Sequence, residues 1–132
     1  MANDGRDLIN LLEAELRFIE LGGYDPSRPN AWYPKSIFRD SLTCINFGSP
    51  YRSRTCRDCH LFEFVESEHR SEDTPCHFIP LTDRGETIAG LERVTSVTRL
   101  KHEVKNWLRW KIQQLGTDRS RTNPAQLKGG LR

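Results

Sequence analysis

Four clustered cysteines constrain the fold of this chain more than any other feature of its sequence. Cys44, Cys56, Cys59 and Cys76 fall within a window of 33 residues, and the rest of the 132-residue chain has no cysteine. Cys56 and Cys59 form a Cys-x-x-Cys turn, which brings two thiolates to one side of a tight loop, as two corners of a tetrahedral zinc site require. The spacing therefore predicts a structural zinc ion held by all four cysteines.

Other uses of these cysteines are weighed against zinc. Two disulfides would require an exported domain, and a Cys-x-x-Cys redox pair would require an activated thiolate, for which a helix N-terminus is the usual setting. The run Cys56-Arg57-Asp58-Cys59-His60 also matches the attachment signature of c-type haem, but Met1 is the only methionine available as a second axial ligand. His60 and His77 each follow a cysteine, and either could replace its neighbour as a zinc ligand.

The composition predicts one domain with a thin core. Hydrophobic residues make up 36% of the chain and charged residues 29%, whereas an ordinary globular chain is roughly 45–50% apolar when glycine is counted. We expect a single zinc-stapled domain over residues 1–116, followed by a disordered basic tail over residues 117–132, where apolar residues are almost absent.

Two amphipathic helices are predicted at the ends of the domain. Apolar residues recur at helical spacing over residues 4–21, with Asp4 as the N-cap and Gly22-Gly23 as the stop. A longer helix extends to about Leu115, and Gly116 is expected to end it. Its apolar stripe begins at Val97, and Lys101 and Lys111 intrude on the stripe, so their stems must lie along apolar surface while the charges reach water.

The segment between the helices predicts a β-hairpin. Residues 61–66 and 76–81 are aromatic and β-branched and are bounded by turn residues, which is typical of two paired strands. Pairing would bring Cys76 close to Cys59. Thr82 or Asp83 then offers an N-cap, with Glu86 completing a capping box for the next helix. The predicted class is α+β, with N- and C-terminal helices packed on a short hairpin and a zinc-stapled loop region.

Two stretches resemble known kinds of protein. After the predicted hairpin, Leu81-Thr82-Asp83-Arg84-Gly85 resembles the end of the wing in winged-helix regulators, although residues 66–74 are acidic and wings that meet phosphates are basic. The central run with Cys-x-x-Cys, Glu68-His69-Arg70 and residues 75–81 resembles small bacterial proteins with four clustered cysteines. That resemblance spans about residues 17–115 and implies no activity, only that the four cysteines act together.

The net charge of +2 conceals a strong asymmetry. Residues 93–132 sum to +8 and residues 1–92 to −6, which predicts either internal charge pairing with the acidic N-terminal helix or a basic surface for an acidic partner. The candidate contact residues are Arg52, Arg54, Arg57, Lys105 and Arg109.

The sequence favours binding over catalysis. It has no phosphate-binding glycine loop, nucleophile elbow or metalloprotease helix motif. It also has no membrane-length apolar run and no signal peptide, so we expect a cytoplasmic protein. The predicted function is a non-catalytic binding or adaptor module with a protein or nucleic-acid partner and no small-molecule substrate. The alternatives are a nucleic-acid-binding regulator that uses the basic C-terminal helix with the arginines at 52, 54 and 57, and a Cys-x-x-Cys thiol-redox protein.

Overall fold

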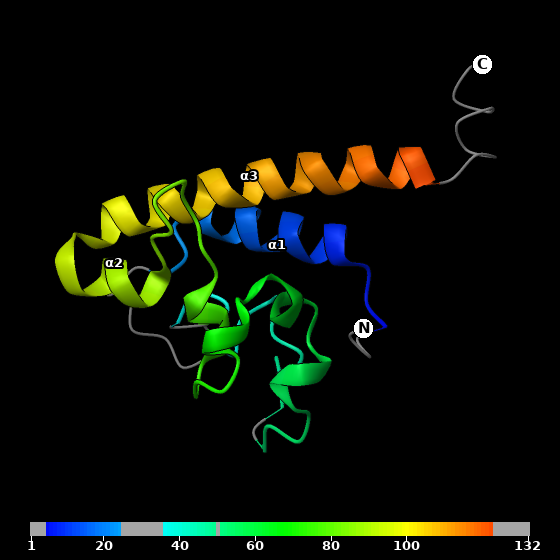
Figure 1. Cartoon of the computed structure of the whole chain (residues 1–132), viewed down its shortest axis with the longest axis horizontal. Helices are drawn as coiled ribbons and strands as arrows, with labels where there is room; N and C mark the ends of the chain where they lie inside the picture. The colour runs from blue at the N-terminus through cyan, green and yellow to red at the C-terminus, as the bar shows by residue number, and fades with distance from the viewer. Residues whose placement is uncertain (1–4, 25–35, 50, 123–132) are drawn as a thin grey trace.

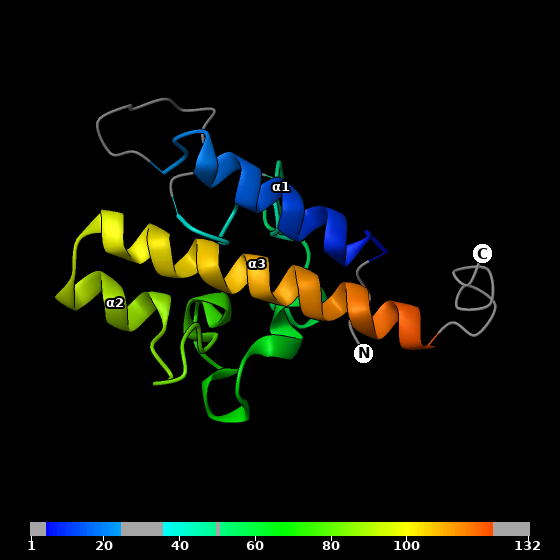
Figure 2. The same ribbon diagram turned by 90° about the horizontal axis from the view of Figure 1, so that it is seen from above.

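The computed structural model describes residues 5–24, 36–49 and 51–122, with side chains through residue 118. Over these residues the chain forms three α-helices, α1 (Leu8–Glu20), α2 (Ile88–Val94) and α3 (Val97–Thr122), joined by irregular chain with short 3-10 turns. Figures 1 and 2 show α1 and α3 side by side and antiparallel, with α2 folded back beside the start of α3. The segment that carries the cysteines, residues 36–49 and 51–81, forms a second layer beneath the helices (Figure 1), which we call the irregular layer.

The predicted α+β class is wrong, because the described ranges contain no β-strand and therefore no hairpin. The two expected strands are instead the 3-10 turns η2 (His60–Phe64) and η4 (Pro75–Phe78). In the first, Leu61 and Val65 are buried while Glu63 is exposed, a spacing that suits a helical turn better than the alternation of a strand. The resemblance to a winged-helix wing therefore loses the hairpin on which it depended.

The prediction for the first helix is confirmed in type and in its stop. Asp7 is the N-cap, and its carboxylate accepts a hydrogen bond from the Asn10 backbone N–H at 2.9 Å. Gly22 has a φ of +99°, and its N–H donates to the Ile19 carbonyl at 3.0 Å, which closes the end of α1. The expected start at residue 4 with Asp4 as the N-cap is wrong, because α1 begins at Leu8 and is capped by Asp7; Asp4 itself lies outside the described residues.

The last two helices start and end elsewhere than expected. Instead of opening a helix, Thr82 closes a turn in which its carbonyl accepts from the Gly85 N–H at 2.9 Å. The Thr87 hydroxyl caps α2 by accepting from the Gly90 N–H at 3.1 Å. The expected stop at Gly116 is also wrong, since α3 continues to Thr122; residues 123–132 of the predicted tail lie outside the described part.

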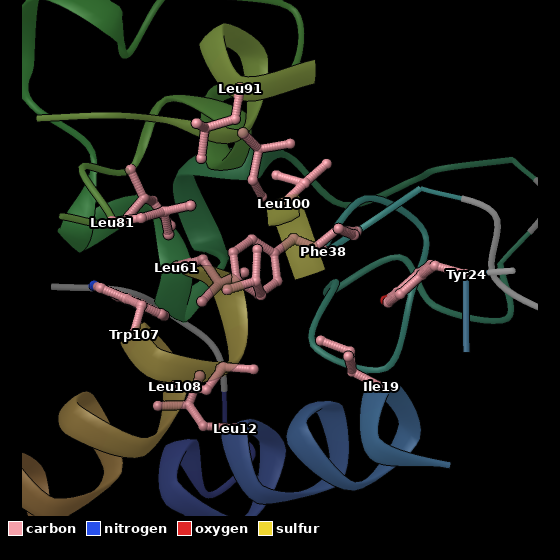
Figure 3. Packing of buried hydrophobic residues seen from close by; sticks show 14 of the residues in the cluster. Leu12, Ile19, Tyr24, Phe38, Leu61, Leu81, Leu91, Leu100, Trp107 and Leu108 are labelled. Carbon is pink, nitrogen blue, oxygen red and sulfur yellow. The ribbon is translucent and has the colours of Figure 1, made fainter. Parts of the chain in front are cut away.

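The core lies between α3 and the irregular layer. Phe38 is completely buried near its centre, close to Leu61 and Leu100 (Figure 3), and its ring packs edge-on against Trp107 with centroids 6.0 Å apart. Lys111 differs from the expectation that its charge would reach water: its Nζ lies 4.7 Å from the ring centroids of both Phe64 and Trp110, so the charge rests over aromatic faces. The predicted apolar stripe of α3 is buried from Leu100 to Leu108, whereas Ile112 and Leu115 are half-buried and Val97 is 47% exposed.

A buried carboxylate fastens the irregular layer to α1. Glu15 accepts hydrogen bonds from the hydroxyls of Tyr24, Ser41 (3.3 Å) and Thr43 (3.0 Å), and from the Thr43 backbone N–H at 3.4 Å. Burial raises the pKa of Glu15, and these hydrogen bonds oppose the rise. The cluster positions the residues immediately before Cys44.

We expect Glu15→Ala to lower the free energy of unfolding by about 3 kcal/mol, because several buried donors lose their acceptor. Glu15→Gln keeps the shape and an acceptor, so it should cost far less.

The stability that Glu15 contributes should also depend on pH. The folded chain holds the Glu15 proton more tightly than the unfolded chain, for which the usual pKa is 4.5. Wild-type stability relative to Glu15→Gln should therefore fall as pH rises above about 4.5. Urea denaturation of the three proteins from pH 4 to 7 measures this, and a relative rise would contradict it.

Candidate metal centre

The four cysteines reach one pocket from separate parts of the irregular layer. Cys44 lies in a turn that follows the Glu15 cluster, Cys56 and Cys59 stand at the two ends of the turn η1 (Cys56–Asp58), and Cys76 lies in η4. All four are free thiols, and all four line the same pocket. The fold therefore brings together residues that are up to 32 positions apart in the sequence.

Short local hydrogen bonds set the backbone around each cysteine. The Cys44 N–H donates to the Ser41 carbonyl at 2.9 Å, and the Cys59 N–H donates to the Cys56 carbonyl at 3.0 Å. The backbone N–H of Asn46 also points at the Cys44 Sγ, 3.4 Å away. An N–H donor on sulfur stabilises the thiolate over the thiol, and the thiolate is the form that binds a metal.

The pocket is small and mostly apolar. Its free interior volume is ≈ 20 Å³, enough for one water-sized body, whereas sites for organic ligands are roughly 300–1,000 Å³. Beside the cysteines, its walls are apolar and aromatic side chains with a few polar neighbours: Phe38, Ile45, Leu61, Phe62, Pro75, Arg39, Arg52, Asp73 and Thr74. The size suits a single ion better than a substrate.

The cysteine side chains border the pocket without meeting at one point. Within the part of the chain that the structure describes, no three His, Cys, Asp or Glu side chains lie close enough together to hold a metal ion. The four cysteines therefore share a pocket as donors of the right type and number, and their role as metal ligands stays a prediction.

The thiols influence one another electrostatically. Burial raises the pKa of Cys76, and the negative charges that Cys44, Cys59 and Cys56 would carry as thiolates raise it further. Burial also raises the pKa of Cys44, while the Asn46 N–H and the positive charges of Arg6 and Arg39 oppose the rise. A cation in the pocket would remove the mutual repulsion and favour the thiolates.

The two histidines that follow cysteines are engaged elsewhere. The His60 Nε2 lies 2.7 Å from the Arg6 carbonyl oxygen, and the His77 Nε2 lies 2.7 Å from the Ile37 carbonyl oxygen. Among the described residues that line the pocket, neither histidine is present. Burial lowers the pKa of His77, so the neutral imidazole is favoured there.

The predicted basic contact residues do not form one surface. Arg109 on α3 has its Nη2 3.0 Å from the Glu20 Oε2 on α1, which is the internal pairing between basic and acidic helices that the charge asymmetry allowed. Lys105 is half-buried on α3. Arg52, Arg54 and Arg57 lie instead in and beside the loop that precedes the Cys-x-x-Cys turn, in the layer beneath the helices (Figure 1).

A buried amide that the sequence did not reveal closes this loop. The Asn46 Nδ2 donates to the Arg54 carbonyl at 2.8 Å, and its Oδ1 accepts from the Arg54 N–H at 2.9 Å. The side chain thus pairs with both backbone groups of one residue, as a neighbouring strand would. We call the described residues between these two positions, 47–49 and 51–53, the Asn46 loop.

Comparison with protein-family models, with curated proteins and with solved structures found no match to this chain. Over the described residues, no helix combines the length and the apolar character that crossing a membrane requires.

We expect Asn46→Ala to lower the free energy of unfolding by about 2 kcal/mol, since two backbone groups of Arg54 lose their partners. Trypsin should then cleave after Arg52 or Arg54 faster than in the wild-type chain, because the base of the loop is no longer closed. Cleavage after Arg84, which lies on an exposed turn before α2, is the internal control. Equal acceleration at Arg84 would point to global destabilisation and contradict a local role.

Proposed function

We propose that this chain is a non-catalytic binding module whose irregular layer is held together by a structural zinc ion on Cys44, Cys56, Cys59 and Cys76. The observation that carries the proposal is that four cysteines from three separate turns line one pocket of ion size. Zinc, when bound, would supply four thiolate bonds that link these turns. Because the four side chains do not yet meet at one point, binding would draw them together.

A structural ion fits the composition of the site better than a catalytic one. Catalytic zinc has three protein ligands and keeps one position open for water or substrate, whereas four thiolates fill the tetrahedral shell. The apolar walls formed by Phe38, Leu61 and Phe62 also leave no room for an organic substrate beside the sulfurs. These features favour binding over catalysis.

The irregular layer has a physical need for such an ion. From residue 36 to residue 80, the described backbone hydrogen bonds are local turns, and no strand pairing links distant parts of the segment. Structural zinc contributes apparent free energies of roughly 10–16 kcal/mol in small zinc-finger peptides. A contribution of that order would offset the small core of a chain with 36% hydrophobic residues.

The thiol-redox alternative has less support. A reactive Cys-x-x-Cys thiol needs a lowered pKa, which a helix N-terminus or a nearby cation normally provides. Here Cys56 begins a 3-10 turn of three residues, Cys59 is buried, and the pKa values of Cys44 and Cys76 are raised. With raised pKa values, the Cys44 and Cys76 thiols are poor nucleophiles, although a metal can still displace their protons.

The zinc prediction is tested on full-length protein purified under reducing conditions without a chelator. We expect one zinc ion per chain by elemental analysis, and a fall of about 10 °C or more in the melting temperature when the ion is removed. Each of Cys44→Ser, Cys56→Ser, Cys59→Ser and Cys76→Ser should lose the metal. His60→Gln and His77→Gln are matched controls that should keep it. The proposal would be refuted if the protein contains no metal as purified and Cys44→Ser leaves its melting temperature unchanged.

Metal uptake should depend steeply on pH. The pKa values of the Cys44 and Cys76 thiols are raised, so both hold protons at neutral pH and must release them on binding. We expect at least two protons per ion, and therefore an increase of about a hundredfold in apparent affinity per pH unit between pH 6 and 8. Chelator competition measures the affinity, and an indicator dye in weakly buffered solution counts the protons. Uptake that does not change with pH would contradict thiolate ligation.

A further inference from the structure

The Asn46 loop projects two aromatic side chains into solvent. Tyr51 is 89% exposed and Phe47 is 47% exposed, although the chain has few large apolar residues to fill its core. The loop is nevertheless ordered at its base, because the Asn46 amide holds both backbone groups of Arg54. Within it, the Ser49 N–H donates to the Asn46 carbonyl at 2.8 Å. The exposed rings are therefore carried by a closed and supported loop.

The loop and its flanks are basic. Arg52, Arg54 and Arg57 lie in this stretch, and no Asp or Glu occurs between Ser41 and Arg57. The Arg52 side chain is oriented by an ion pair with Asp40, which engages only some of its five N–H donors. Arg57 is exposed on η1. The surface thus combines solvent-facing aromatic rings with guanidinium groups and carries a charge opposite to that of phosphate.

We propose that the Asn46 loop binds single-stranded nucleic acid, with Tyr51 and Phe47 stacking on bases and the arginines contacting phosphates. The inference rests on the proposed function, because Cys44 and Cys56 flank the loop and a shared zinc ion would fix both of its ends. Exposed rings beside positive charge are the combination that single-strand-binding surfaces use. A duplex keeps its base faces stacked, and a loop of this length presents no helix to a major groove.

The position of this surface differs from the one that the charge asymmetry suggested. Arg109 on α3 is paired with Glu20, and Lys111 is directed over aromatic rings of the protein itself. The Asn46 loop lies in the lower layer on the side away from α3 (Figure 1). The proposed contact surface is therefore the loop rather than the basic helix.

Fluorescence anisotropy with the full-length protein tests the inference. The probe is a fluorescein-labelled oligothymidylate of about 12 nucleotides, within the usual site size of such surfaces. We expect Tyr51→Ala to weaken binding about tenfold, Phe47→Ala to weaken it as well, and Tyr51→Phe to retain it. With two or three phosphate contacts, the logarithm of the affinity should fall against the logarithm of salt concentration with a slope of about −2, and Arg57→Gln should reduce that slope by about 0.7.

Two control variants match these changes elsewhere on the surface. Leu21→Ala removes an apolar side chain that is 77% exposed at the end of α1, and Arg84→Gln removes one exposed positive charge on the turn before α2. Both should bind like the wild type. Unchanged affinity in Tyr51→Ala would overturn the inference, as would equal binding of a duplex of the same length. Equal binding of a polyglutamate peptide would assign the loop to an acidic protein partner instead.

Zinc content measured on every variant separates the two proposals. Tyr51→Ala and Arg57→Gln should keep one zinc ion and the wild-type melting temperature while they lose affinity for the oligonucleotide. Zinc-loaded protein that does not bind the single strand at low salt would refute the loop inference and leave the structural zinc proposal standing. Protein that contains no metal as purified and still binds the oligonucleotide through Tyr51 would refute the zinc proposal and support the loop inference.

Discussion

The lower half of this protein depends on a carboxylate that α1 carries into the interior. Burying a carboxyl group costs free energy unless hydrogen-bonding groups surround it, and Tyr24, Ser41 and Thr43 provide these groups around Glu15. Tyr24 lies just after the end of α1, and Ser41 and Thr43 lie in the turn before Cys44. The helix can bury Glu15 only if those two segments lie where they do, so the carboxylate fixes the approach of the chain to the cysteine pocket.

Side chains do the linking elsewhere in this layer too. Arg6 donates to the carbonyls of Thr43 and Cys44, both at 3.1 Å, and the Arg39 Nη1 donates to the Thr74 hydroxyl at 2.7 Å. Each of these bonds links segments that lie far apart in the sequence, a link that backbone hydrogen bonds provide in a β-sheet. Each such bond contributes about 1 kcal/mol, so a bound ion that joined three turns at once would contribute far more to the stability of this layer.

The sequence predicted the presence of the two terminal helices correctly and several of their ends incorrectly, and it predicted the middle of the chain poorly. A helix is encoded locally, by its 3.6-residue spacing and by caps such as Asp7 and Gly22. The run Leu61–Glu66 is too short for spacing to distinguish a strand from a 3-10 turn, and the outcome there depended on burial of Leu61 and Val65 against distant residues. Glu15 left one readable sign, since it lies between Leu12 and Ile19 on the apolar face. The hydrogen bonds from the Asn46 amide to Arg54 left no sign in the sequence, because an exposed asparagine in a turn has the same local sequence.

The antiparallel packing of α1 on α3 also sets an order of events during synthesis. Leu12 and Ile19 on α1 belong to the same core as Trp107 and Leu108 on α3, yet the whole cysteine segment is translated between them. A nascent chain therefore presents its four thiols to the surrounding solution before α3 leaves the ribosome and the core can close. For that interval, the first helix can pack only against apolar residues of the cysteine segment, such as Phe38 and Leu61, and its contact with α3 forms last.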